Sequence, residues 1–225
     1  GGAIGAGLFV GSGQAISIAG PAVLISYLVA GGIVVLIMAM LAEMVAARPS
    51  SGAFSSYAQK AMGRSAGSAV GWLYWIQLVV VIAAEATGAG GIISAWIPGI
   101  PAWMWVLVFV VALTAVNLFG VRNYGTFEFW FAAIKVAAII VFLVVGVCAI
   151  VGFIPGVPAT GIGNLVDNGG FAPNGLTGIA AALLIVVFAF GGTEVVAIAA
   201  AESDDPARNI RRIVREVLVP VSYTH

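Results

Sequence analysis

The chain has 225 residues, of which 62% are hydrophobic and only 8% are charged, whereas soluble domains carry about 25% charged residues. This composition excludes a water-soluble domain and indicates a membrane protein surrounded by lipid. Nine basic and nine acidic residues give a net charge of zero, so nucleic acid is not an expected partner. One cysteine and one histidine exclude an internal disulfide and a His/Cys metal cluster, and we expect neither a metal site nor a cofactor.

Six apolar segments approach the roughly 20 residues that a helix needs to cross the hydrocarbon core. We expect spans at residues 1–19, 21–44, 68–96, 101–119, 124–153 and 176–201. A polar connection with a short helical stretch near residues 57–62 follows the second span, and a tight turn containing proline and glycine follows the third. These segments predict an all-α polytopic bundle.

The spans form one predicted transmembrane domain over residues 1–217, and residues 218–225 are an unassigned tail. The chain opens on Gly1 within apolar sequence, so we expect it to be a piece of a longer protein.

Basic residues are distributed unevenly between the connections. Those outside the spans all follow spans two, four and six: Arg48, Lys60, Arg64, Arg122, Arg208, Arg211, Arg212 and Arg215. Connections rich in lysine and arginine face the cytoplasm. We therefore expect a multi-pass protein of the cell membrane whose even-numbered connections are cytoplasmic.

The first span is unusually rich in glycine, reading GGAIGAGLFVGSG over residues 1–13. Each glycine costs a regular helix about 1 kcal/mol relative to alanine. Irregular backbone at membrane depth is tolerated where it is buried in protein or lines a cavity, since its amides and carbonyls need partners. A bound polar ligand can be that partner, and close packing of small residues between helices is the alternative.

The sixth span contains a second interruption, FAFGGTE, over residues 188–194. Paired interruptions in two spans indicate a transporter binding site. The half-helix after Gly5 would direct amides at a carboxylate, and the carbonyls ending the first half of span six would face an ammonium group. An amino-acid zwitterion carries both groups. Gly5, Gly7 and Gly11 also resemble a dinucleotide-binding fingerprint, but the strand that must precede that motif is missing.

Four strings carry a specific family resemblance: GAIGAGLF, RPSSGAFSSYA, EFWFAAIKV and FAFGGTEVVAIAAAESDDPARNI. With them, the chain resembles the amino acid permeases of the amino acid, polyamine and organocation (APC) transporter superfamily, from Gly1 to about Val217. The match covers the first six of the usual twelve spans. The resemblance implies a five-plus-five inverted-repeat fold with broken helices one and six, secondary active uptake, and usually coupling to protons.

The resemblance also implies a binding site made largely of main-chain groups. The substrate carboxylate would be held by the amides of Gly5, Ala6 and Gly7, and the α-amino group by the carbonyls of Ala3, Phe188, Ala189 and Gly191. Family members often have Thr or Ser where this chain has Ala6, so a hydroxyl contact would be lost here. Phe190 and Thr193 would gate or shape the pocket for the substrate side chain.

Ionisable groups inside the spans are functional candidates, because a charge there costs at least about 2.5–3.5 kcal/mol on insertion scales. We expect proton coupling to involve Glu194, Lys135 or Glu85. The resemblance places Glu194 beside the site and Lys135 where sodium-coupled relatives of the fold hold an ion. The alternatives are a structural hydrogen bond for either glutamate, and an ion pair or a snorkelling amine for the lysine.

Other charged and aromatic residues have simpler interpretations. Glu43 and Glu128 are expected to be interfacial. An aromatic belt at the span ends is expected from Trp72, Tyr74, Trp75, Trp96, Trp103 and Trp105.

The leading functional hypothesis is import of an amino acid coupled to protons. An exchanger would use the same site with a counter-substrate, and a membrane sensor would bind without transport. An enzyme is not expected, since the spans hold no histidine and an isolated Cys148. The expected partners are an amino acid, protons and membrane lipid. Aromatic, small neutral and cationic substrates all stay open, as does the oligomeric state.

Overall fold

The computed structural model describes residues 5, 7–50, 52–119, 124–156, 159, 161–167, 169–195 and 198. All regular structure in these residues is helical. The elements in order are the π-helical turn η1 (Gly7–Gly11), α1 (Ser12–Ala19), the 3₁₀ turn η2 (Gly20–Ala22), α2 (Val23–Ala47), α3 (Ala53–Met62), α4 (Arg64–Trp96), α5 (Ala102–Phe119), α6 (Tyr124–Val151), the 3₁₀ turn η3 (Gly163–Leu165) and α7 (Gly175–Ala189).

Four helical segments in the described residues are long and apolar enough to cross a membrane: Gly7–Ala47, Arg64–Trp96, Phe129–Val151 and Gly175–Val195. The number differs from the six spans predicted for two reasons. η2 follows α1 directly and α2 follows η2, so Gly7–Ala47 counts as one helical segment, and the apolar part of α5, Ala102–Leu118, is shorter than the other segments. The chain is therefore an all-helical membrane bundle.

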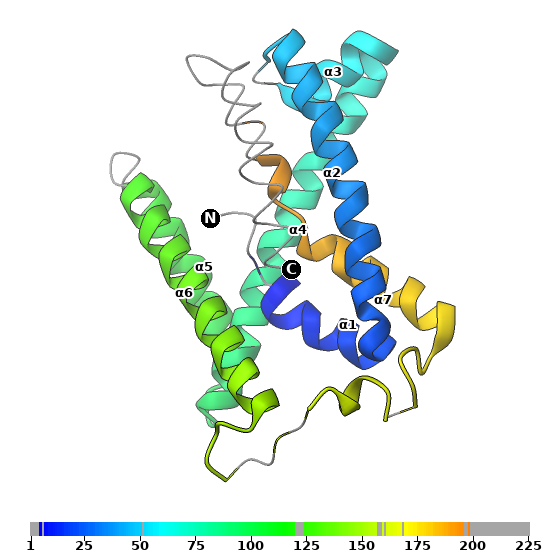
Figure 1. Cartoon of the computed structure of the whole chain (residues 1–225). Coiled ribbons are helices and arrows are strands. Elements are labelled where there is room, and N and C mark those ends of the chain that lie inside the picture. Colours follow the sequence, from blue (N-terminus) through cyan, green and yellow to red (C-terminus); the bar gives the residue numbers. More distant parts are fainter. Residues whose placement is uncertain are drawn as a thin grey trace.

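A sharp bend nevertheless separates α1 from α2. Gly20 has φ +62°, a left-handed conformation that favours glycine, and Pro21 follows it at the start of η2. A Cβ atom on Gly20 would lie 2.7 Å from Cγ of Pro173, so the bend also needs glycine for space. Figure 1 shows α1 crossing the lower part of the bundle at a steep angle to the long α2.

α7 packs against both arms of this bend. The Ser26 hydroxyl in α2 donates a hydrogen bond to the carbonyl of Ile179 at 2.9 Å, and the Asn174 amide donates to the carbonyl of Ile18 at 2.7 Å. Apart from one aromatic ring, the core of this contact is built from small and medium-sized side chains, as is usual where membrane helices approach closely. The buried members are Ala15, Ala19, Val23, Ala30, Ala182, Val186 and Phe190.

α3 and α4 form a second packed unit, which α5 extends. The short helix is longer than the stretch predicted near residues 57–62, and α4 begins at Arg64, ahead of the predicted start at residue 68. Hydropathy marks where apolar sequence begins, whereas backbone hydrogen bonds continue through polar residues at the membrane surface. Tyr57 ties α3 to the end of α2, because its hydroxyl donates to the carbonyl of Arg48 at 2.9 Å.

Two adjacent glycines in α4 give a test of this packing. A Cβ atom on Gly90 would lie 2.6 Å from Cγ2 of Val106 and 3.0 Å from the carbonyl oxygen of Ala102 in α5, whereas a Cβ atom on Gly91 meets nothing within 4 Å. We expect Gly90→Ala to destabilise the whole protein by about 1–3 kcal/mol through this clash, and Gly91→Ala to leave stability unchanged or slightly raised. Thermal unfolding of the purified variants measures both. Equal effects of the two substitutions would contradict the α4–α5 contact.

Candidate functional site

The first interruption is a change in helix type at the start of α1. Gly7–Gly11 forms a π-helical turn before the α-helix begins at Ser12, and the amide of Leu8 donates to the carbonyl of Gly5 at 3.2 Å. Short π-helical segments are rare in proteins as a whole, and many of those that occur lie at functional sites. The glycine-rich sequence therefore produces irregular backbone where it was predicted.

The second interruption ends α7 at Ala189. Beyond that residue the hydrogen bonds span three residues: the amide of Phe190 donates to the carbonyl of Val187, and the amide of Gly191 to that of Phe188, at 3.2 and 3.1 Å. Gly192 has φ +93°, which favours glycine at this point in the turn. The α-helical ladder is thus broken within the predicted string FAFGGTE.

The two interruptions lie against each other. A Cβ atom on Gly7 would collide with Cα of Ala189 and would lie 2.9 Å from its backbone nitrogen. Only a glycine allows the two backbones to approach so closely. Figure 1 shows the beginning of the α1 arm and the end of α7 meeting near the centre of the bundle, beside α4. The amino end of one broken helix therefore meets the carboxyl end of another.

One carboxylate lies against each interruption. A Cβ atom on Gly5 would collide with Oε1 of Glu85, so the α4 carboxylate adjoins the backbone before η1. Oε2 of Glu194 accepts a hydrogen bond from the amide of Gly192 at 2.9 Å, which holds the turn after α7.

Phe190 and Thr193 are buried in the packed core. The Thr193 hydroxyl donates to the carbonyl of Phe190 at 3.0 Å, and the Phe190 ring meets the Tyr27 ring of α2 edge-on, with centroids 6.3 Å apart. Both side chains are about 95% buried, with exposed fractions of 4% and 5%. In this conformation both side chains pack into the core and support the turn that follows α7.

The other candidates are placed less closely together. Phe188 and Ala189 form the last turn of α7, and Gly191 follows it. Lys135 lies on α6, a different helix from those that carry the interruptions. Ala3 and Ala6 lie outside the described residues. Across the described part of the chain, no three His, Cys, Asp or Glu side chains gather as a metal ion would require.

The structure adds one residue that the sequence analysis assigned elsewhere. Tyr74 was expected in the aromatic belt, but it packs against Phe54 of α3 with ring centroids 5.4 Å apart and lies within electrostatic range of Glu194. Its neighbours Trp72 and Trp75 are exposed. Tyr74 therefore lies on a more buried face of α4 than Trp72 and Trp75 do. Nothing in the sequence indicates that Tyr74 lies near the sixth span.

A helical membrane bundle with two adjoining broken helices is the architecture of secondary transporters. The sequence profile of the family described as amino acid permease matches residues 1–223. The chain belongs to the amino acid permease family of the APC superfamily.

Characterised relatives support this assignment. The chain is 54% identical over 222 residues to the aromatic amino acid transport protein AroP of Corynebacterium glutamicum, covering 99% of this chain and 48% of that protein. It is 53% identical to the gamma-aminobutyric acid permease of Escherichia coli, covering 98% and 47%, and 44% identical to AroP of that species, covering 97% and 48%. The chain thus spans about half the length of these relatives. No solved structure matches it.

Cysteine cross-linking tests the contact between the interruptions in the whole permease. A Cβ atom on Gly11 lies 3.2 Å from Cγ2 of Ile185 in α7, and one on Gly13 has no neighbour within 4 Å. In a background where Ser replaces Cys148, we expect Gly11→Cys with Ile185→Cys to form a disulfide on mild oxidation. Gly13→Cys with Ile185→Cys should not. Cross-linking is read by mass spectrometry of the cleaved protein, and equal yields from both pairs would contradict this arrangement.

Proposed function

We propose that the whole permease takes up an amino acid across the cell membrane together with protons, and that the two adjoining interruptions form its binding site. The observation that carries this proposal is the backbone contact between Gly7 of η1 and Ala189 of α7. It brings a helix start, with its partly positive amides, next to a helix end, with its partly negative carbonyls. A zwitterion fits such a pair of opposite dipoles.

The proposed contacts use groups that every amino acid shares. The amides of Gly5, Ala6 and Gly7 would hold the carboxylate, as helix starts commonly hold anions. The carbonyls of Ala3, Phe188, Ala189 and Gly191 would receive the ammonium group. The amide of Gly191 donates to the carbonyl of Phe188, and the amide of Phe190 is shared between that carbonyl and the carbonyl of Val187, so the ammonium group would share the Phe188 carbonyl with the turn.

Proton coupling follows from charge repulsion at the same place. An ionised Glu85 beside Gly5 would repel a substrate carboxylate bound to the neighbouring amides. A proton on Glu85 removes that repulsion, so proton binding and substrate binding would strengthen each other. Glu194 and Lys135 are the further coupling candidates. We assign Glu194 mainly to the geometry of the turn, because it already accepts the Gly192 amide.

The main-chain site leaves the substrate side chain open. Relatives named for aromatic amino acids and for gamma-aminobutyric acid make these the first compounds to test. For the orientation in the membrane, we propose that the connections after spans two, four and six are cytoplasmic, because arginine and lysine are concentrated in them.

Uptake by the whole permease in proteoliposomes is the central experiment. We expect a labelled aromatic amino acid or gamma-aminobutyrate to accumulate when the outside is more acidic than the inside, and accumulation to fall when a protonophore removes the gradient. Uptake that is indifferent to the gradient would contradict proton coupling, and uptake that requires an internal amino acid would identify an exchanger.

Two glycine variants control this experiment. Gly7→Leu should insert into the membrane but neither bind nor transport, because its side chain separates η1 from Ala189. Gly13→Leu should keep activity close to wild type, since that position faces open space. Normal substrate binding by the Gly7 variant would reject the site.

Glutamine substitutions separate coupling from geometry. We expect Glu85→Gln to keep substrate binding and to lose the dependence of uptake on the proton gradient, because glutamine does not ionise. Glu194→Gln should keep both, since its side-chain oxygen can still accept the Gly192 amide. Glu194→Ala should weaken binding about tenfold through loss of that bond. Binding constants and uptake at two pH gradients measure these effects, and gradient dependence that is lost only in Glu194→Gln would move the coupling role to Glu194.

A further inference from the structure

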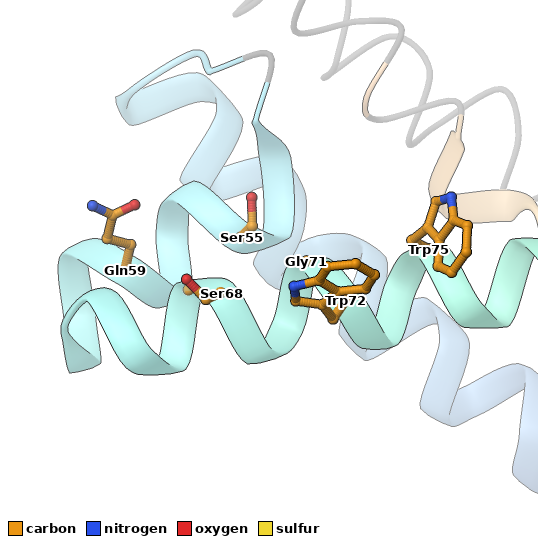
Figure 2. Close-up of a pocket in the computed structure, with 7 residues that line it drawn as sticks. Ser55, Gln59, Ser68, Gly71, Trp72 and Trp75 are labelled. Atoms are coloured by element: carbon orange, nitrogen blue, oxygen red, sulfur yellow. The ribbon is translucent and has the colours of Figure 1, made fainter.

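A groove between α3 and α4 is separate from the interruptions. It has a volume of about 510 Å³, within the range of about 300–1,000 Å³ common for small-molecule sites. Figure 2 shows Ser55 and Gln59 of α3 on one side of the groove, and Ser68, Trp72 and Trp75 of α4 on the other.

The polar groups of this groove are available to a ligand. Within the described part of the chain, the Gln59 amide and the Ser68 hydroxyl form no hydrogen bond, whereas the Ser55 hydroxyl donates to Gly52 at 2.9 Å. Gly71 forms part of the wall, where a Cβ atom would be 3.5 Å from Cβ of Ser55. The groove therefore offers two polar side chains without a hydrogen bond in the described residues, beside a wall at Gly71 where α3 and α4 lie close together.

The charged residues on the two helical stretches that form the groove are basic, and the Glu194 carboxylate lies near Tyr74, toward its other end. Residues 53–75 contain Lys60 and Arg64 and no acidic residue. Arg64 precedes Ser68 by four residues on α4, which places both on the same face of the helix. A phosphate group at the Ser68 end of the groove would lie within reach of a guanidinium, the partner that phosphates prefer.

The order of side chains along α4 matches the profile of a bilayer surface. Arg64 is charged, Ser68 is polar, and Trp72 and Trp75 are exposed aromatic residues with ring centroids 5.6 Å apart. The whole series covers about 16 Å along the helix axis at 1.5 Å per residue, enough to run from the headgroups into the upper hydrocarbon. Tryptophan favours this boundary.

We propose that the α3–α4 groove binds an anionic phospholipid. Its phosphate is held by Arg64, Ser68 and Gln59, and its glycerol and upper acyl chains lie along Trp72 and Trp75. Cytoplasmic leaflets attract basic segments through their anionic lipids, and here a shaped groove adjoins the basic residues. Bound lipid would fasten α3 to the amino-terminal end of α4.

Native mass spectrometry of the whole permease tests this site. Purified protein is titrated with phosphatidylglycerol and with phosphatidylcholine carrying the same acyl chains. We expect phosphatidylglycerol to bind about tenfold more tightly, and Arg64→Gln to remove roughly that preference by deleting a charge-assisted bond. Ser68→Ala should weaken binding by a smaller factor, and Gly71→Leu should block it by filling the groove.

Arg122→Gln is the matched control, since it removes one arginine from the connection between α5 and α6 and should leave lipid binding unchanged. Equal binding of the two lipids, or equal effects of the Arg64 and Arg122 substitutions, would overturn the proposal. Competition by soluble glycerol phosphate as strong as by lipid would instead identify a free-phosphate site. An unchanged lipid affinity in Gly71→Leu would show that other helices of the permease occupy the groove. If Arg64→Gln does not fold, the weaker lipid binding expected of Ser68→Ala still tests the proposal.

Discussion

The close backbone contact between Gly7 and Ala189 is the constraint on which the proposed site depends. Two helices that cross with side chains between them stay about 8–10 Å apart at their axes, too far for their main-chain ends to share one small ligand. Removing the side chain at Gly7 lets an amino end and a carboxyl end adjoin. The cost is an irregular helix end on both sides, because η1 is π-helical and the hydrogen bonds after α7 span three residues in place of four. Bound substrate can offset part of that cost.

Much of this arrangement could be predicted because it depends on residues that are neighbours in the sequence. Glycine clusters mark where a helix is expensive, so both interruptions were located to within a few residues. The family was recognised from the same strings and is confirmed by the match over residues 1–223. Side-chain directions were harder. Tyr74 faces inward and Trp72 outward on one helix, and Phe190 lies in the core behind the turn, because tertiary packing decides those faces.

The two carboxylates differ in a way that composition cannot reveal. Glu85 reaches its neighbour from another helix, across a sequence separation of eighty residues (85 − 5 = 80), whereas Glu194 bonds within its own turn. A carboxylate that bonds within its own turn stabilises the conformation of that turn. A carboxylate that reaches a binding site from a separate helix can change its protonation or position when a ligand binds. The α3–α4 groove likewise joins separate elements, since Ser55 and Gln59 of α3 face Ser68, Trp72 and Trp75 of α4.

The outer ends of α1 and α7 are fastened together by the Asn174 amide on Ile18 and by the contact of Pro173 with Gly20. Gly7 meets Ala189 at the other end, and Ala15 and Ala19 pack with Ala182 and Val186 between them. Contacts at both ends and in the middle hold α1 and α7 together as one packed pair. A rotation of either helix would therefore carry its neighbour with it and leave the contact between Gly7 and Ala189 in place.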